Sequence, residues 1–374
     1  MVINGHMKIT KMNKLDLDYQ NLLRDILDNG VIKETRNGGT ISVFGCQIRH
    51  NMSEGYPLLT TKKMAVKAMI TELKWFLKGD TNIKYLVDNG CHIWDGDAYK
   101  NYCKNFENII GDEFKNLGIE NSINLDWVKS TPPLTQEEFI DKIKTDDEFA
   151  KKWGELGFIY GAQWRNWTRR TTREEKIVNP GIYTEQIDQI QTLINDLKTN
   201  PDSRRLMVSA WAVHDLPNMV LPPCHYGFQV YTKEMTLEER LEWNYKNSDP
   251  LSRSMDYFPE HLDSIGVPKR KISLMWNQRS CDFPLGIPMN ISSYALLLEL
   301  IGKEVNMVPD ELIGNLGDCH IYLNQIEGVK QQLKREPYDL PKIHLSNCNL
   351  LNGEFDYEII GYVSHPKIYF PLSN

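Results

Sequence analysis

The most constraining feature of this sequence is a cysteine that directly follows two prolines. Residues 220–232 read VLPPCHYGFQVYT, and the segment after Cys224 predicts a β-strand that begins at His225. Pro222 and Pro223 lack a backbone N–H and have a fixed φ, so they stiffen the chain without extending the hydrogen-bond ladder of the sheet. A thiol held at the mouth of a strand is suited to nucleophilic chemistry, although a lone cysteine is more often a small buried hydrophobe.

Composition and charge narrow the possible functions. The 374 residues are 41% hydrophobic, which is enough for a sizeable core, and the net charge of −7 argues against a general nucleic-acid or membrane-surface binder. An anionic ligand must therefore be held by a local cluster of arginines. No apolar run approaches the roughly 20 residues of a membrane span, and residues 1–11 have no apolar signal core, so we expect a cytoplasmic protein.

The seven cysteines form no recognisable metal motif. Their number is odd, and none lies in a C-x-x-C pair. This pattern is typical of reduced thiols in a cytosol and gives no zinc signature. The sequence therefore predicts no metal site.

Hydrophobic spacing predicts an alternation of helices and strands. Helices are expected at 15–28, from Thr60 onward, from the cap residue Thr135 to 152, at 186–198 and at 291–305, and strands at 41–52, 206–211, 225–231 and 271–278. Residues 285–290 are expected to form a tight loop. The polar stretches at about 100–155 and 233–270 are predicted to be surface insertions in one domain of residues 8–374.

Arginines occur in three separate places. Arg36 lies in a glycine-bearing loop where it can contact a phosphate, although a surface hairpin is the more common explanation. Arg204 and Arg205 open the predicted strand at 206–211, so their side chains should point to opposite faces. They could serve a site across a subunit interface, or one ligand if the strand end is irregular. Residues 165–173 are expected to form a basic, solvated loop.

Together these features favour covalent chemistry on a nucleotide. Two or three arginines suit a phosphate dianion, and the amide of Asn290 can make a two-pronged contact with the edge of uracil. The Cys224 thiolate can add to an electron-poor carbon, and a nearby arginine favours that thiolate. Glu72 lies at the edge of an apolar helix face, where it is either a solvated flank or a half-buried carboxylate that is paired or used.

The sequence resembles the thymidylate synthase family. The resemblance rests on the motifs LPPCH, SRR, QRSCD, P-x-N-I-x-SYALL and GD-x-HIY in this order, and it covers residues 15–99, 157–232 and 271–374. It implies one α/β (α+β) domain per subunit, built on a twisted mixed sheet with surrounding helices. It also implies a homodimer joined by those sheets.

The resemblance further implies a reaction. Cys224 would attack C6 of deoxyuridylate (dUMP), and C5 would then take up the methylene of 5,10-methylenetetrahydrofolate. Transfer of a hydride from the folate would give thymidylate (dTMP) and dihydrofolate. Closure of the C-terminal tail would exclude water.

Site residues follow from the positions that match the family's motifs. The phosphate would be bound by Arg36, Arg279 and Ser280, joined by Arg204 and Arg205 from the other subunit. The base and sugar would be held by Asn290, with Gln278 beside the arginine, and by His320 and Tyr322. Waters and proton transfer would be organised by Glu72, Tyr160 and His225. The folate would be contacted by Ile93, Trp94, Asp282, Leu285, Gly286, Met289 and Leu372.

Several departures from the family pattern concern the folate site. Asp97 stands where the family usually has a second tryptophan, Phe283-Pro284 where it has Val-Phe, and Met289 where it has Phe. The phosphate loop is also one residue shorter.

These departures leave alternatives open. A carboxylate at Asp97 could admit water, so a deoxyuridylate hydroxymethylase, in which water captures the methylene, is the first alternative; Asn290 argues against a cytosine-specific version. An RNA-binding regulator that uses residues 165–173 is disfavoured by the acidic net charge. An inactive nucleotide-binding paralogue is disfavoured because Cys224 and the arginines are all present.

Overall fold

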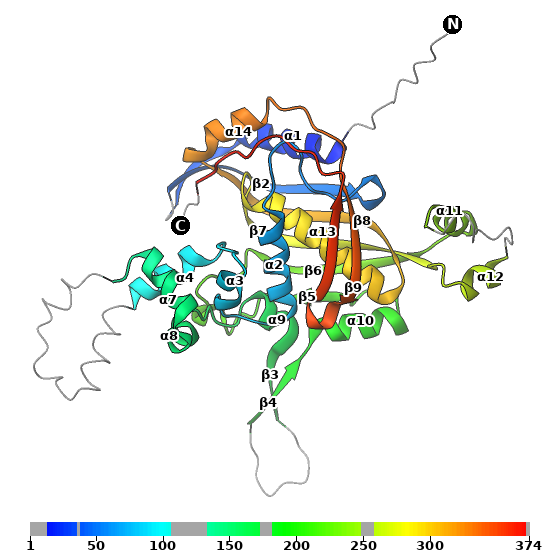
Figure 1. Cartoon of the computed structure of the whole chain (residues 1–374), viewed down its shortest axis with the longest axis horizontal. Helices are drawn as coiled ribbons and strands as arrows, with labels where there is room; N and C mark the ends of the chain where they lie inside the picture. The colour runs from blue at the N-terminus through cyan, green and yellow to red at the C-terminus, as the bar shows by residue number, and fades with distance from the viewer. Residues whose placement is uncertain (1–12, 36–37, 106–132, 173–181, 248–257, 372–374) are drawn as a thin grey trace, which may run out of the picture. The chain divides into compact units, whose positions relative to one another are not determined.

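The structure, a computed structural model, describes residues 13–35, 38–105, 133–172, 182–247 and 258–371 (Figure 1). The chain divides into two compact units. Unit 1 comprises Met1–Ala65, Gln189–Ser209 and Cys224–Ser373, and unit 2 comprises Val66–Asp188, Ala210–Pro223 and Asn374. That residues 8–374 form a single domain stays a prediction.

A mixed six-stranded sheet is the core of unit 1. Its strands, in spatial order, are β1 (Val31–Thr35), β2 (Gly38–Asn51), β8 (Val308–Tyr322), β7 (Arg270–Asp282), β6 (His225–Glu234) and β5 (Met207–Ser209). Only β7 and β8 are parallel; the other neighbours are antiparallel. The predicted mixed sheet with surrounding helices is confirmed.

Helix α13 (Gly286–Val305) covers one face of this sheet and packs against β7 and β8 (Figure 1). Most of its residues are buried, as expected for a helix that is apolar nearly all round. The predicted loop at 285–290 is wrong, because α13 already begins at Gly286 and includes Asn290. Pro288 is compatible with this start, since N–H groups in the first turn of a helix have no intrahelical acceptor.

Other elements of unit 1 surround the sheet. They are α1 (Lys14–Asn29), α10 (Gln189–Thr199), α14 (Ile326–Gln332), the hairpin of β9 (Lys342–Asn349) and β10 (Glu354–Ile360), and the helices α11 (Leu237–Asn247) and α12 (Pro259–Ser264). Helix α1 is joined to the segment after β2 by buried Asp16, which accepts hydrogen bonds from the hydroxyl groups of Thr60 and Thr61 at 2.8 Å. The predicted insertion at 233–270 contains α11 and α12, which lie beyond the end of β6 and before the start of β7 (Figure 1).

Unit 2 is mainly helical. It contains α2 (Val66–Leu77), α3 (Lys84–Asp88), α4 (Asp95–Lys104), α7 (Gln136–Thr145), α8 (Asp147–Trp153), α9 (Tyr160–Asn166) and the hairpin of β3 (Trp167–Thr172) and β4 (Ile182–Ile187). Thr135 caps α7 in a capping box with Glu138, as predicted. In the insertion at 100–155, the rings of Tyr102 and Phe139 lie 5.2 Å apart and form part of an aromatic cluster.

Several predicted boundaries are wrong. The helix expected from Thr60 begins at Val66, and the helix expected at 186–198 is preceded by β4 and begins at Gln189. The described part of this segment, residues 165–172, is not a solvated loop: Arg165 lies in the last turn of α9 and pairs with Asp188 at 2.8 Å, and β3 follows. A 3.6-residue pattern detects these helices, but ends depend on caps and tertiary contacts.

Within the described ranges, no helix combines the length and the apolar character needed to cross a membrane.

Candidate active site

Cys224 lies at one edge of the unit 1 sheet, directly before β6. Because β6 is antiparallel to β7 and β7 is parallel to β8, the start of β6 meets the ends of β7 and β8 at this edge. The carbonyl oxygen of Cys224 accepts a hydrogen bond from the backbone N–H of Arg279 at 2.8 Å. Cys224 is half-buried and is not part of a disulfide. A backbone hydrogen bond therefore places Cys224, directly before β6, beside Arg279 on β7.

The backbone around the cysteine is irregular. The pairing of β6 with β7 shifts between His225 and Gly227, and such bulges are frequent next to active sites. Gly227 also lies close to β5, where a Cβ atom would be only 2.8 Å from the carbonyl oxygen of Val208. A side chain at this position would push β5 and β6 apart.

An amide pair lies at the same edge of the sheet. Gln278 on β7 donates from Nε2 to Asn290 Oδ1 on α13 at 3.1 Å, and to the carbonyl oxygen of Ser280 at 3.0 Å. Asn290 Nδ2 is thereby left as a donor, while Oδ1 keeps a second lone pair. A uracil edge offers a carbonyl oxygen and an N–H group, which match this donor and this acceptor.

His225 is buried and uncharged near neutral pH. Its Nδ1 lies 2.8 Å from the hydroxyl oxygen of Tyr294 on α13, and burial lowers the pKa of His225 to about 3. A neutral imidazole can donate and accept hydrogen bonds, but it brings no positive charge to the site.

Asp282 ends β7, and its carboxyl group is half-buried. Its two oxygens accept hydrogen bonds from the backbone N–H of Leu285 at 3.1 Å and from Gln325 Nε2 at 3.3 Å. Burial raises the pKa of Asp282, and these two donors partly oppose the rise. Gly286 lies between Asp282 and Asn290, since a Cβ atom there would be 3.8 Å from each. Met289 follows in the first turn of α13.

His320 and Tyr322 lie at the end of β8, two positions apart. Their ring centroids are 5.2 Å apart at an interplanar angle of 86°. His320 is opposite Asp282 in the parallel register, and its Nδ1 lies 3.1 Å from Asp318 Oδ1. Both residues belong to the strand, as Arg279 and Ser280 do on β7.

Two further residues near Asp282 were missed by the sequence reasoning. Lys62 is buried, contacts the carbonyl oxygen of Pro284, and lies with its Nζ 4.8 Å from the ring centroid of Phe370. Burial lowers the pKa of Lys62 to about 8, although Asp282 opposes this. Gln325 donates from Nε2 to the carbonyl oxygen of Pro371 at 3.2 Å.

These contacts connect the C-terminal segment to the end of β7. No sequence signal could have found them, because neither residue belongs to a motif and their partners lie far along the chain.

Glu72, Trp94 and Tyr160 gather within unit 2. Glu72 on α2 is 8% exposed and accepts a hydrogen bond from Trp94 Nε1 at 2.8 Å. Burial raises the pKa of Glu72 to about 7, while the Trp94 donor opposes the rise. The rings of Trp94 and Tyr160 are 5.8 Å apart, and Tyr160 has a φ of 25°, a strained value for a non-glycine residue. Glu72 is therefore a buried, paired carboxyl rather than a solvated flank.

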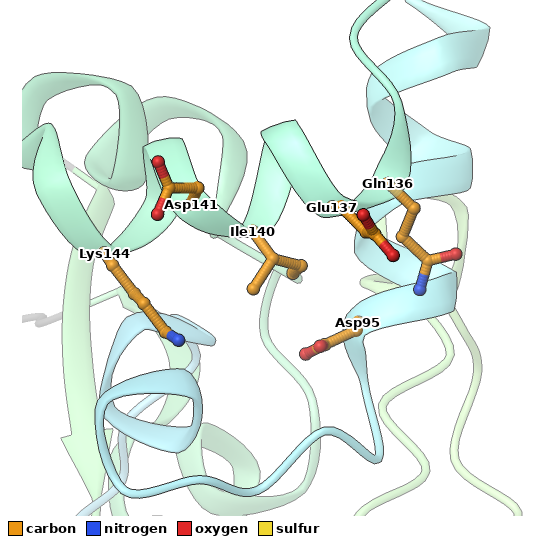
Figure 2. Close-up of a pocket in the computed structure, with 6 residues that line it drawn as sticks. All are labelled: Asp95, Gln136, Glu137, Ile140, Asp141 and Lys144. Atoms are coloured by element: carbon orange, nitrogen blue, oxygen red, sulfur yellow. The ribbon is translucent and has the colours of Figure 1, made fainter.

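A shallow pocket of about 500 Å³ lies elsewhere in unit 2 (Figure 2). Figure 2 shows Asp95 of α4 facing side chains of α7 across it. The pocket is lined by Asp95, Gln136, Glu137, Ile140, Asp141 and Lys144. None of these belongs to the predicted site, although Asp95 directly follows Ile93 and Trp94 in the sequence and its Oδ2 lies 2.7 Å from His92 Nδ1.

The two arginines before β5 are not brought to Cys224. Arg204 and Arg205 lie in a turn rather than on a strand, so the expected alternation of their side chains does not apply. The carbonyl oxygen of Arg204 lies 3.5 Å from Gln229 Nε2. Gln229 is five residues from Cys224 along β6, or roughly 17 Å at about 3.4 Å per residue.

Two predicted site residues, Arg36 and Leu372, lie outside the described residues. Among the residues that the structure does describe, no group of three or more His, Cys, Asp or Glu side chains is arranged to hold a metal ion.

Comparison with known proteins identifies the family. The family model described as "Thymidylate synthase" matches residues 17–374. The chain is 39% identical over 359 residues to the thymidylate synthase of Listeria monocytogenes serotype 4a (strain HCC23), covering 95% of this chain and 99% of the relative.

Two other relatives carry the same name. The thymidylate synthases of Mycoplasma mobile (strain ATCC 43663 / 163K / NCTC 11711) and Mesoplasma florum (strain ATCC 33453 / NBRC 100688 / NCTC 11704 / L1) are each 40% identical, over 94% of this chain and 97% of the relative. The resemblance found in the sequence is confirmed, and the hydroxymethylase alternative is not favoured. The chain belongs to the thymidylate synthase family.

Proposed function

We propose that this chain is a thymidylate synthase that converts dUMP to dTMP through a covalent bond from Cys224 to the pyrimidine. The observation that carries the proposal is the pairing of Cys224 with Arg279 across β6 and β7, at the edge where Gln278 orients Asn290. Family membership supports the same reaction.

Nucleotide binding is assigned to the edge of the unit 1 sheet. Arg279 and Ser280 are proposed to bind the phosphate, with Arg36, while His320 and Tyr322 hold the sugar hydroxyl. Attack of the Cys224 thiolate on C6 breaks the C5–C6 double bond and moves negative charge toward the C4 carbonyl oxygen. The Asn290 Nδ2 donor is suited to stabilise that charge.

Proton transfer is assigned to Glu72, with Tyr160 and His225 organising water. A carboxyl group whose pKa is about 7 can both accept and release a proton near neutral pH. The neutral His225 can order water without competing for that proton.

The end of β7 and the start of α13 fit the pterin of a folate. The Asp282 oxygens each accept one hydrogen bond and so keep acceptor capacity for pterin N–H groups. When bound, 5,10-methylenetetrahydrofolate supplies the one-carbon unit and the hydride. The residues proposed to contact it are Ile93, Trp94, Asp282, Leu285, Gly286, Met289 and Leu372.

One face of the unit 1 sheet supports a homodimer. A row of paired residues, Met207, Gln229, Met275 and Ile313, crosses β5, β6, β7 and β8, and none of the four is buried within the chain. Such a partly apolar sheet face is suited to pack against a second copy. Cytoplasmic location, like the dimer, stays a prediction.

Arg204 and Arg205 are proposed to act in the partner's site, because roughly 17 Å of β6 separates them from Cys224 of their own chain. Mixing two inactive variants tests this. We expect Cys224→Ala and the double variant Arg204→Ala/Arg205→Ala to regain about one quarter of wild-type activity when dissociated and reassociated together, because half of the dimers are mixed and each has one intact site.

The same two variants incubated without dissociation serve as the control. If the reassociated sample contains mixed dimers but stays as inactive as the two separate variants, the arginines act within their own chain.

Product analysis tests the proposed reaction. With dUMP and 5,10-methylenetetrahydrofolate, we expect equal amounts of thymidylate and dihydrofolate. Formation of 5-hydroxymethyldeoxyuridylate together with tetrahydrofolate would instead establish the hydroxymethylase reaction.

A further inference from the structure

A tryptophan on β7 extends the hydrogen-bond chain that orients Asn290. Trp276 Nε1 donates to Gln278 Oε1 at 3.2 Å, and Gln278 Nε2 in turn donates to Asn290 Oδ1 at 3.1 Å. Trp276 and Gln278 are two positions apart on one strand, so their side chains share a face of the sheet. They are 0% and 3% exposed, respectively.

Two groups give this series of hydrogen bonds its direction: the indole N–H can only donate, and the carbonyl oxygen of Ser280, which accepts from Gln278 Nε2 at 3.0 Å, can only accept. Gln278 must therefore turn Oε1 toward Trp276, which leaves Nε2 facing Asn290. Asn290 must in turn present Oδ1 to Gln278. The reverse orientation of Asn290 would bring two NH₂ groups together and leave both without that acceptor.

The indole is itself held by its neighbours. It stacks on Tyr294 of α13, with ring centroids 5.4 Å apart and an interplanar angle of 8°. On β8, Gly314 leaves room for it, since a Cβ atom there would lie 2.4 Å from two atoms of the Trp276 ring. The indole cannot turn without displacing α13 or β8.

We infer that Trp276 is a positioning residue that sets the preference of this site for uracil over cytosine, acting through Gln278 on Asn290. Uracil presents a C4 carbonyl oxygen and an N3–H group, whereas cytosine presents a C4 amino group and an N3 acceptor. An Asn290 amide with Nδ2 free as a donor and Oδ1 facing Gln278 matches uracil at both positions. The inference rests on the proposed function in placing the pyrimidine edge at Asn290.

The test is Trp276→Phe, which keeps an aromatic ring against Tyr294 and removes the N–H donor. The ratio of kcat/KM for dUMP to kcat/KM for deoxycytidylate should fall about tenfold, as expected for the loss of one hydrogen bond. Trp75→Phe is the matched control: Trp75 is also 0% exposed and donates from Nε1 to the carbonyl oxygen of Asn82 at 3.0 Å. Its ratio should stay within about twofold of wild type.

A second variant tests the route through Gln278. In Gln278→Glu, the introduced carboxylate accepts from both neighbours and favours the reversed Asn290 amide, so the ratio should fall by more than about tenfold. Adding Trp276→Phe to Gln278→Glu should change the ratio little further, because the donor no longer sets a direction. Independent, multiplying effects would contradict the inference.

Dissociation constants for dUMP and deoxycytidylate are measured on the same variants. An unchanged binding and kinetic ratio in folded Trp276→Phe would overturn the inference. A wild-type protein that makes no thymidylate, but whose binding ratio falls in Trp276→Phe, would overturn the proposed reaction and leave the inference standing.

Discussion

Replacing Cys224 with serine should reduce kcat by at least about 10,000-fold. A serine hydroxyl stays protonated near neutral pH and is a much weaker nucleophile than a cysteine thiolate. Binding of dUMP should change little, since the substitution exchanges sulfur for oxygen and leaves the backbone contact between Cys224 and Arg279 in place. Steady-state turnover and equilibrium nucleotide binding measure the two effects separately.

Cys348→Ser is the matched control. Cys348 is half-buried like Cys224, but it lies on β9 and contacts the carbonyl oxygen of Ser346 at 3.5 Å. Its kcat should remain within about twofold of wild type. If Cys224→Ser kept kcat within about tenfold of wild type, Cys224 would not be the nucleophile.

Glu72→Gln should lower kcat by roughly 100- to 10,000-fold, the range typical of a general acid or base. The wild-type kcat profile should show a group with a pKa near 7, the value to which burial raises Glu72, and this group should be absent from the variant. A profile of kcat between pH 5 and pH 9 makes the comparison.

Glu72→Gln should also make the free energy of unfolding less dependent on pH. The pKa of Glu72 is raised from 4.5 to about 7; the folded state therefore holds this proton more tightly than the unfolded state. The protonated Glu72 therefore contributes about 3 kcal/mol to the free energy of unfolding. This contribution is fully present below pH 4.5 and is lost as the pH rises through about 7. Urea unfolding at pH 5 and pH 8 should show a smaller difference for Glu72→Gln than for wild type.

Glu299→Gln separates these two effects. Burial also raises the pKa of Glu299 on α13 to about 7, so this substitution should reduce the pH dependence of stability in the same direction. Its kcat should stay near the wild-type value, because Glu299 has no role in the proposed chemistry. Equal losses of kcat in both variants would attribute the Glu72 effect to folding.

Local sequence patterns predicted the elements better than the ends of those elements. The strand after Cys224 and the Thr135 cap follow from residue type and spacing. The start of α13 at Gly286 was missed because Pro288 and Gly286 normally indicate a loop, although both fit a first helical turn. The turn at Arg204 was missed because β5 is only three residues long.

Most of the geometry of the site could not be predicted from the sequence. The bond from Gln278 to Asn290 depends on how β7 packs against α13, and the contact of Lys62 with Pro284 joins positions 222 residues apart. Such contacts arise from tertiary packing, which periodicity does not encode. The roles of individual residues came from the resemblance to the family rather than from spacing alone.

The central claim is a covalent bond between Cys224 and C6 of the pyrimidine. A dUMP analogue with fluorine at C5 should trap this bond, because fluorine cannot leave as the C5 proton does. After incubation with this analogue and 5,10-methylenetetrahydrofolate, mass spectrometry of the digested protein should find the added mass on the peptide that contains Cys224. An adduct on a different peptide, or turnover of dUMP by a protein that forms no adduct, would contradict the account.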